Sequence, residues 1–387
     1  MRLSPLVTGL TLAASLVPAG LPLSAAGAAS CAPPTTLLSR TPTVRSLPGG
    51  ASMRIWDTGT TSDPVKAQRI VAVRIPATSA LRARVVSTGA LTTATTVGTY
   101  ASRVAASVVT INGSVFDPAR GALPVELVQQ NGVPLKGDTS LQGVVAIGPD
   151  RKAFPDWLHL SGKAVAGGRT WPVTGLNWGA VTGSGVNVYT TAWGTVARPY
   201  GAVDVVVANG RVVSRRTGTA RGKAPASGQR ILTANGTVGT QLAALRVGDP
   251  VTLAYGQVST LGRKIVDAIA RGHRYVYGDN GSQSEGGDCS TRDEQLRPRT
   301  AVGWTANGDT LVVTVSGHAV LNGVMWGGST HHQMPTYLRQ LGAISAVGLD
   351  GGGSTTMFVR STTTSAPWRV DRPGAAQRRV PNALAWY

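Results

Sequence analysis

The stretch RTAVGWTANGDTLVVTVSG, residues 299–317, contains two segments in which apolar residues alternate with small or polar ones. Asn307-Gly308 lies between them, and an Asn-Gly pair favours the tight turn of a β-hairpin because both residues tolerate a positive φ. Apolar residues at every second position place one face of each strand against a core. The stretch therefore predicts an antiparallel hairpin.

The same alternation recurs in segments that end in Gly, Asn, Asp or Pro: 69–76, 82–88, 107–113, 125–135, 143–150 and 202–214, the last with a second turn at Asn209-Gly210. Helical patterns are few, namely IVDAIARG (265–272) and MPTYLRQLGA (334–343). Val, Thr and Gly are abundant, which suits strands and turns. These features predict a β-rich α+β fold with mixed sheets and few helices.

The first thirty residues have the features of a secretory signal peptide. Arg2 precedes an apolar run that ends in small residues near Ala26 to Ser30, and Pro18 and Pro22 interrupt it. No other segment approaches the ~20 apolar residues of a membrane span. We expect a secreted, extracellular protein with a Thr/Pro-rich entry and first strands at 31–104, and a main domain at 105–387 in which 155–265 could be an insert.

The chain has two cysteines, Cys31 and Cys289. In an oxidising compartment they favour one disulfide over two free thiols. Lipid attachment at Cys31 would exclude that disulfide, but Ala28 stands where a lipoprotein signal usually has Leu, which favours plain secretion. Neither cysteine lies in a CxxC pair, so they do not form a zinc site by themselves.

The chain is basic, with 37 Lys+Arg against 18 Asp+Glu and a formal net charge of +19. This charge is either a solvated surface or a means of attraction to anionic polymers such as phosphate-bearing cell-wall or capsule chains. The basic residues are scattered, with no aromatic-interleaved stripe or nucleic-acid motif, so we expect no nucleic-acid partner.

Three segments carry polar residues at predicted strand ends. In GLDGGGSTTMFV (348–359), Asp350 precedes Gly351–Gly353 and the hydroxyls of Ser354 and Thr355. Such a turn is either an anion-binding nest beside a carboxylate or a tight turn that Asp350 caps. No Lys follows the glycines, so it is not a P-loop.

The second segment, QLRPRTAVG (295–303), places Arg297 and Arg299 directly before a strand, where a guanidinium can bind a phosphate with two hydrogen bonds. The third, INGSVFDP (111–118), places Asn112 and Asp117 around a short turn at a strand end.

Together, INGSVFDP, RPRTAVGWTANG and LGAISAVGLDGGGSTTM are similar in order and separation to NGGFFDP, RPRTAVG and LDGGGSTTM of the phosphodiester glycosidase family. The resemblance covers most of residues 105–360. It implies hydrolysis of a sugar-1-phosphodiester bond at the anomeric carbon, as in N-acetylglucosamine 1-phosphodiesters, with release of the sugar and a phosphomonoester. A phosphomonoester leaves readily as an anion, so the acid catalyst that most glycosidases need can be dispensable.

On this resemblance, Asp350 stabilises or attacks the anomeric carbon or activates water, Arg299 binds the phosphate, and Asn112 orients substrate oxygens. The other residues expected to bind substrate or phosphate are Gly351, Gly352, Gly353, Ser354, Thr355, Thr300 and Asp117. The substrate would be a phosphorylated glycan or a sugar phosphodiester. The sequence requires no cofactor.

The chain also departs from the family pattern. Ser114 and Val115 occupy the turn after Asn112, and Ser316 stands where an Asp is usual, which could weaken activity or change the substrate. The loop 270–295 contains Asp279, Glu285 and Asp288, as a calcium-like site, a substrate lid or an exposed loop. Glu126 is either a second catalytic carboxylate or a surface residue.

Other interpretations have weaker support. Gly-x-Ser-x-Gly and HExxH are absent, and the pair His331-His332 is expected to be a polar loop. Trp157, Trp171, Trp178 and Trp193 could stack on sugar rings or pack internally. The alternative functions are a non-catalytic binder of phosphorylated wall or capsule glycans and an inert structural protein, in which Arg299 and Asp350 would lie far apart.

Overall fold

The computed structural model describes residues 36–58, 68–218, 222–270, 272–276, 296–317, 319–321, 324–372 and 374–387. The predicted signal peptide, Cys31, Cys289 and the acidic residues Asp279, Glu285 and Asp288 lie outside these ranges, so the interpretations that rest on them stay predictions. Within the ranges, no helix is long and apolar enough to cross a membrane.

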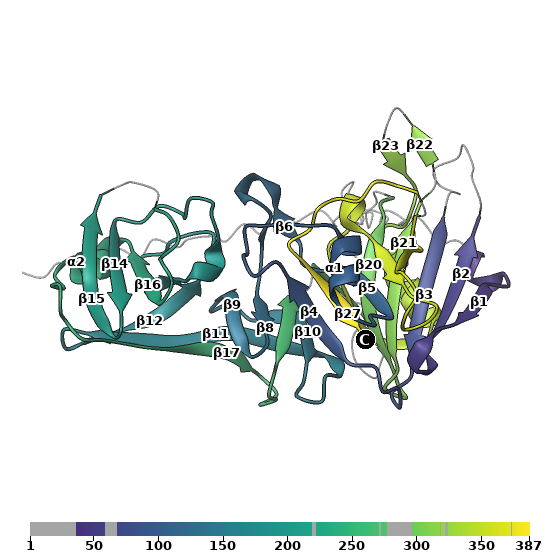
Figure 1. Cartoon of the computed structure of the whole chain (residues 1–387), viewed down its shortest axis with the longest axis horizontal. Helices are drawn as coiled ribbons and strands as arrows, with labels where there is room; N and C mark the ends of the chain where they lie inside the picture. Colours follow the sequence, from purple (N-terminus) through teal and green to yellow (C-terminus); the bar gives the residue numbers. More distant parts are fainter. Residues whose placement is uncertain are drawn as a thin grey trace, which may run out of the picture.

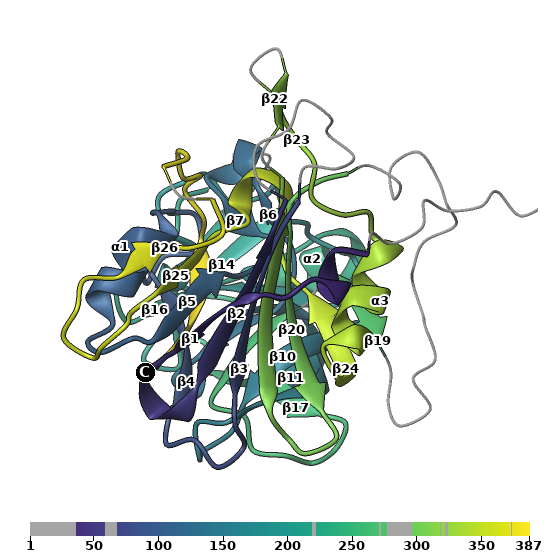
Figure 2. The same cartoon turned by 90° about the vertical axis from the view of Figure 1, so that its right-hand side faces the viewer.

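Two facing β-sheets form the part of the fold that carries the three motifs (Figures 1 and 2). The larger has, in spatial order, β1 (Thr43–Ser46), β2 (Ser52–Asp57), β3 (Arg69–Ile75), β21 (Thr310–Ser316), β20 (Arg299–Thr305), β24 (Ala343–Gly348) and β19 (His273–Val276). The smaller has β26 (Trp368–Arg369), β25 (Met357–Val359), β5 (Val109–Asn112), β27 (Asn382–Trp386) and β4 (Ala83–Ser87).

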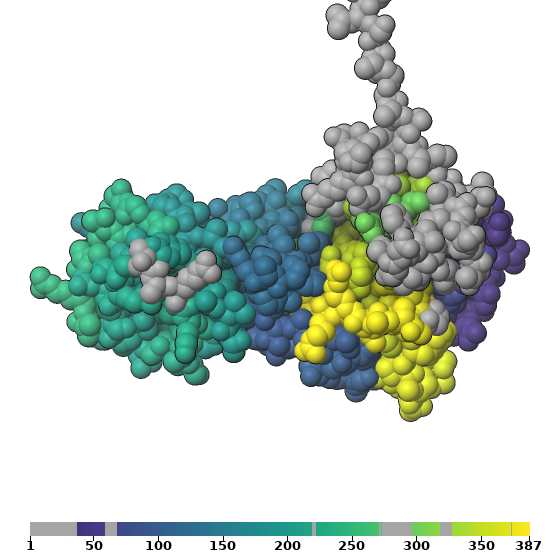
Figure 3. All heavy atoms as spheres, turned by 90° about the horizontal axis from the view of Figure 1, so that it is seen from above, coloured from purple at the N-terminus to yellow at the C-terminus, as the bar shows by residue number. Residues whose placement is uncertain are grey.

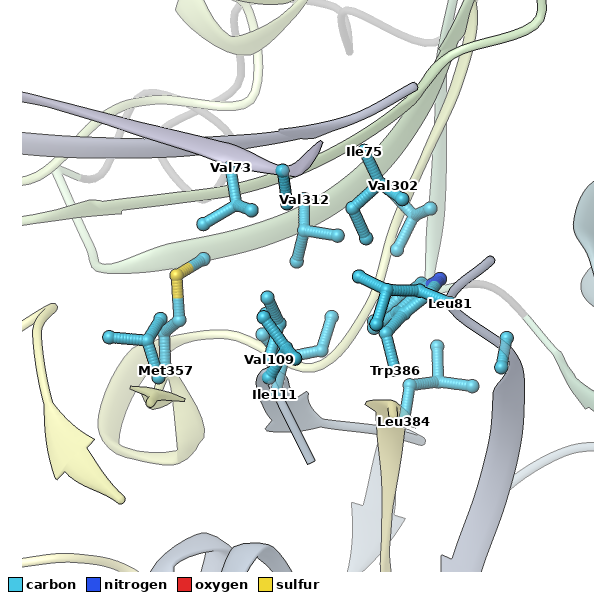
Figure 4. Close-up of a cluster of buried hydrophobic side chains, with 14 of the residues drawn as sticks. Val73, Ile75, Leu81, Val109, Ile111, Val302, Val312, Met357, Leu384 and Trp386 are labelled. Atoms are coloured by element: carbon cyan, nitrogen blue, oxygen red, sulfur yellow. The ribbon is translucent and has the colours of Figure 1, made fainter. Parts of the chain in front are cut away.

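An apolar core fills the space between the two sheets (Figure 4). Val73, Val302 and Val312 point into it from the larger sheet, and Ile111 and Leu384 from the smaller one. All five side chains are buried, as expected where alternate residues of each strand face a common interior.

Helices cover the outer faces of both sheets. On the larger sheet, α3 (Gln333–Gln340) packs Met334, Tyr337 and Leu338 against buried residues of β20 and β21. On the smaller sheet, α1 (Val97–Arg103) packs Tyr100 against Phe358 and its neighbours. The layer order is therefore helix, sheet, sheet, helix.

A long third sheet extends to the left of these layers in Figure 1. Its spatial order is β15 (Arg211–Thr217), β14 (Val203–Ala208), β16 (Gln229–Ala234), β13 (Val186–Tyr189), β12 (Arg169–Leu176), β9 (Val133–Asp138), β8 (Val128–Gln130), β18 (Asp267–Ala270), β10 (Gln142–Ile147), β11 (Ala153–Ala166) and β17 (Val251–Ser259). The far part has its own apolar core, drawn from residues between Leu160 and Val251, and α2 (Gly236–Ala243) packs on it.

Short elements complete the described part of the chain. Two small ladders join β6 (Phe116–Asp117) to β7 (Leu123–Pro124) and β22 (Ala319–Leu321) to β23 (Val324–Trp326). The 3-10 helices are η1 (Thr36–Ser39), η2 (Pro48–Gly50), η3 (Pro118–Arg120), η4 (Thr191–Trp193) and η5 (Gly352–Ser354).

The β-rich α+β fold with mixed sheets is confirmed, since β12 and β13 pair in parallel within a largely antiparallel sheet. The hairpin at 299–317 forms from β20 and β21, and Asn209 and Gly210 both have positive φ in the second turn. The helix predicted at 265–272 was wrong. Residues 267–270 are all buried in strand β18 between β10 and β8, because a short run that is apolar on both faces fits a central strand as well as a helix.

Candidate functional site

The three motifs meet at the side chain of Asn112, at the end of β5. Its Nδ2 donates to the backbone oxygen of Asp350 at 2.7 Å, and its Oδ1 accepts from the Thr300 hydroxyl at 2.8 Å and from the Thr356 N–H at 3.2 Å. Asn112 and Thr300 are buried. One amide thus joins the smaller sheet to the larger sheet and to the segment after β24.

Asp350 follows the end of β24, where its backbone N–H donates to the Gly113 oxygen at 3.0 Å. Burial raises the pKa of its carboxyl from 3.8 to about 6. The nearby Ser354 hydroxyl, the Gly351 N–H at 2.9 Å and the Arg378 guanidinium each lower that pKa and offset part of the rise. A carboxyl that titrates near neutral pH beside cationic groups is a typical feature of a functional site.

The glycine turn allows contacts that a side chain would prevent. Gly352 has a φ of 61°, a conformation that favours glycine. A β-carbon at Gly351 would lie 2.9 Å from the Pro298 oxygen, and one at Gly353 would lie 2.8 Å from Nη2 of Arg378. Glycine at 351 therefore permits close packing on the Pro298 backbone, and glycine at 353 leaves room for the Arg378 guanidinium.

Two arginines flank this turn. Nη1 of Arg299 lies 3.7 Å from the β-carbon position of Gly351, and Nε of the same side chain donates to the Ser329 oxygen at 3.1 Å. On the other side, the exposed Arg378 lies against Gly353. Arg299 and Asp350 are therefore close neighbours, which contradicts the expectation of an inert structural protein.

A buried charge cluster supports the segment that follows the turn. Asp371 has no exposed surface; it accepts from Arg369 at 2.9 Å through each of its two carboxylate oxygens, and from Arg372 at 3.4 Å. Both arginines also donate to the Thr355 oxygen, at 3.4 and 3.2 Å. This cluster fixes Thr355 by its backbone and leaves its hydroxyl inside the protein.

Several predicted roles need correction. The Gly351 N–H donates to Asp350 and the Gly352 N–H to the Pro298 oxygen, so these two groups are not an open cradle for phosphate. Asn112 and Thr300 bond to each other inside the protein, which gives them a positioning role in place of the predicted substrate contact.

Ser354 and Thr355 are also fully buried, with hydroxyls that make no hydrogen bond of ordinary geometry within the described residues. Asp117 caps η3, where it accepts from the Ala119 N–H at 2.9 Å and pairs with Arg120 at 3.4 Å. Its carboxylate serves its own turn, so the structure does not bring it to Asp350.

Ser316, at the position where the family usually has Asp, is buried at the end of β21. Its hydroxyl donates to the Asp371 backbone oxygen at 2.8 Å. The residue therefore packs behind the site against the segment that carries the buried charge cluster.

The sequence analysis missed Arg378. The available signal was the pair Arg378-Arg379 a few residues before β27, which is similar to Arg297 and Arg299 at the start of β20. What the sequence did not indicate is that the segment after β26 returns to the glycine turn.

The comparisons with known proteins agree with this site. Residues 202–387 match the phosphodiester glycosidase family, which confirms the resemblance carried by the motifs. The match covers somewhat less than half of the chain; it includes the second and third motifs, and INGSVFDP precedes it.

A curated relative is the N-acetylglucosamine-1-phosphodiester alpha-N-acetylglucosaminidase of Bos taurus, 26% identical over 203 residues. That alignment spans 46% of this chain and 36% of the bovine protein, so well under two thirds of the relative is represented.

Two solved structures share the fold. A hypothetical protein from Synechocystis matches with a TM-score of 0.70 at 20% identity, over 87% of this chain and 62% of that one. A Burkholderia pseudomallei K96243 protein that carries the name of an exported protein matches with a TM-score of 0.63 at 18% identity, over 82% and 74%.

Proposed function

We propose that the protein is a hydrolase that cleaves a sugar-1-phosphodiester at the anomeric carbon. The observation that carries the proposal is the arrangement at the glycine turn, which follows a carboxyl with a pKa of about 6 and is flanked by Arg299 at Gly351 and Arg378 at Gly353. Arginine binds phosphate oxygens through its planar guanidinium, and a carboxylate stabilises the cationic carbon of a glycosidic transition state.

In this proposal the two guanidinium groups bind the phosphate, which leaves with the electron pair of the broken carbon–oxygen bond. Water adds to the anomeric carbon, so that the products are the free sugar and a phosphomonoester. Ionised Asp350 stabilises positive charge at that carbon or accepts the proton of the attacking water. Both roles require that its carboxyl has lost a proton.

The first experiment is to incubate the purified chain with an N-acetylglucosamine 1-phosphodiester and follow the released sugar. We expect release by the parent and by Asp150→Asn, a matched control on an exposed turn, and loss of release with Asp350→Asn. Sugar release by Asp350→Asn at the parent rate would contradict the assigned role.

The second candidate function is a binder of phosphorylated wall or capsule glycans, favoured by the net charge of +19. It predicts equal affinity of the parent and Asp350→Asn for the same diester, with release by neither. A titration of both proteins with that diester, run beside the release assay, distinguishes the two functions.

We also propose that the protein acts outside the cell on phosphorylated glycans. The signal-peptide features of residues 1–30 and the name of the Burkholderia protein support this proposal. Expression with the native N-terminus should yield protein in the external fraction. We further expect dialysis against EDTA to leave the rate of sugar release unchanged, because the proposed steps need no metal.

A further inference from the structure

The segment Gly113–Val115 is bonded by its backbone both to Asp350 and to the neighbour of a second carboxylate, Glu126. Asp350 bonds to the Gly113 oxygen through its backbone N–H, and Val125 bonds to the Val115 oxygen in the same way at 2.9 Å. Glu126 follows Val125 directly and lines a small cavity together with Ser114. The backbone groups that carry the two carboxylates are therefore linked through this three-residue segment.

Two adjoining cavities lie on the Glu126 side. The smaller, of about 90 Å³, is bounded by Ser114 and Val115, and the larger, of about 420 Å³, is bounded by Trp178. Both include Val125, Glu126 and Gly272 in their linings. The larger volume lies within the range of about 300–1,000 Å³ that is usual for small-ligand sites.

Gly272 connects these cavities to the end of β24, the strand that precedes Asp350. Its N–H donates to the Gly348 oxygen at 2.8 Å, and a β-carbon there would lie 2.9 Å from Cγ2 of Val115 and 3.3 Å from the Leu349 oxygen. The cavity lining thus touches the residue that precedes Asp350. In Figure 3 the blue surface of this region lies between the yellow C-terminal segments and the teal surface of the third sheet.

The lining of the larger cavity combines a fixed aromatic ring with a carboxylate. Nζ of the buried Lys136 lies 3.3 Å from the centre of the Trp178 ring and donates to the Val125 oxygen at 2.8 Å. One side chain therefore holds two parts of the lining in place. A rigid indole presents an apolar face to the C–H groups of a sugar ring, and a carboxylate accepts hydrogen bonds from its hydroxyls.

The charges of the two sides of Asp350 differ. Arg299 and Arg378 lie at the glycine turn, whereas Glu126 is the one charged residue among the described residues that line the two cavities. A carboxylate disfavours a phosphate beside it and accepts hydrogen bonds from the hydroxyls of a neutral ligand. Burial also holds the pKa of Lys136 well below its usual range, so that positive charge is disfavoured beneath the ring.

We propose that the cavity bounded by Glu126 and Trp178 is the subsite for the sugar, with the phosphate on the opposite side at Arg299 and Arg378. This inference rests on the proposed function. It places the sugar of the substrate on one side of Asp350 and its phosphate on the other. Glu126 hydrogen-bonds sugar hydroxyls and Trp178 stacks on the ring. In this proposal Glu126 is neither a second catalytic carboxylate nor a surface residue without function, but a residue that determines which sugar binds.

The test measures binding of each half of the substrate separately, by calorimetry on the full chain. The probes are the methyl α-glycosides of N-acetylglucosamine, glucose, mannose and galactose, and inorganic phosphate. We expect Trp178→Ala to weaken binding of the preferred glycoside about tenfold or more, with phosphate affinity changed less than about twofold. Glu126→Gln keeps the shape of the side chain and should give the same pattern if Trp178→Ala does not fold.

Arg378→Ala should show the reverse, with phosphate weakened and the glycoside retained. The matched control is Tyr200→Ala, which removes an exposed aromatic ring outside the cavity and should bind both probes like the parent. Failure of the parent to bind any of the four glycosides would overturn the inference, as would parent-like glycoside affinity in both Trp178→Ala and Glu126→Gln. Because binding is read without turnover, a chain that hydrolyses nothing but loses glycoside binding in these variants would refute the hydrolase proposal and keep the subsite.

Discussion

The guanidinium of Arg378 lies against Gly353, so closely that a β-carbon there would be 2.8 Å from Nη2 and 2.9 Å from Cζ. The third glycine of the turn therefore contacts the side chain of an arginine that lies 25 residues further along the chain. This contact explains why residue 353 has no side chain. The turn brings a second positive charge to Asp350.

Gly353→Ala should reduce activity with little loss of stability. The added methyl group meets the flexible end of Arg378, which can move away, so we expect the free energy of unfolding to change by less than about 0.5 kcal/mol. Displacement of the guanidinium should lower kcat/KM for the diester about tenfold or more. Urea unfolding and steady-state kinetics measure the two effects.

Gly352→Ala is the matched comparison, because a β-carbon there meets nothing within 4 Å but the residue has a φ of 61°. We expect it to lower the free energy of unfolding by about 1 kcal/mol. Parent-like kcat/KM in Gly353→Ala would show that the position of Arg378 is unimportant for the reaction.

The rate should depend on the ionisation of Asp350. Because its pKa is about 6 and the ionised form is the active one, kcat/KM should rise with pH and level off above that value. Arg378 lowers this pKa, so Arg378→Gln should move the rise to higher pH, and Arg378→Lys should move it back. A profile that is flat between pH 4 and 8 would rule out Asp350 as the titrating group.

Asp350→Asn should stabilise the protein at neutral pH. In the folded state the pKa of the Asp350 carboxyl is raised from 3.8 to about 6. The free energy of unfolding of the parent therefore falls as pH rises through this interval, and it stays at the lower value above it. Removal of the ionisable group should add roughly 1–3 kcal/mol to the free energy of unfolding at pH 7. At pH 3 the two proteins should be equally stable, since the parent carboxyl is then protonated in both states.

Asp150→Asn is the control for this experiment, because its carboxylate is exposed on a turn. Urea unfolding at pH 3 and pH 7 provides the comparison. A parent that equals or exceeds Asp350→Asn in stability at pH 7 would show that burial of Asp350 carries no cost.

Asn112→Ala should disrupt both the fold and the site, because it removes the partner of Thr300, Thr356 and Asp350 at once. We expect a loss of about 2–4 kcal/mol in the free energy of unfolding. Asn187→Ala is a matched control, since Asn187 is also fully buried and donates to the Ala180 oxygen in the third sheet. It should lose stability but keep the specific activity of its folded fraction, whereas Asn112→Ala should lose both.

The sequence analysis located β3, β20 and β21, because their apolar runs are short and end at turn residues. It did not show that β20 and β21 are buried on both faces, which α3 and the facing sheet cover. It did not identify residues 265–272 as a strand, because residues 267–270 are buried on both faces and show no period of two. It also gave no indication of α1 or α2, which are short and rich in Gly, Thr and Ala.

At the site, the motifs placed Asp350 and Arg299 correctly beside each other, because both follow or precede neighbouring strands. The sequence did not predict whether each polar side chain points toward the substrate or into the protein. Whether the Asn112 amide faces substrate or protein depends on Thr300, 188 positions away. Arg378 was missed for the same reason, since its contact with Gly353 exists only when a distant loop folds back.

Strand β27 lies between β4 and β5, with Asn382 paired to Ser87 and Ala383 paired to Asn112. A sheet that closes with so large a sequence separation forms slowly and late in folding. The ribosome must therefore have released residue 386 before Asn112 has its strand neighbours. The candidate site of the nascent chain is thus not fully assembled until nearly the whole chain has been synthesised.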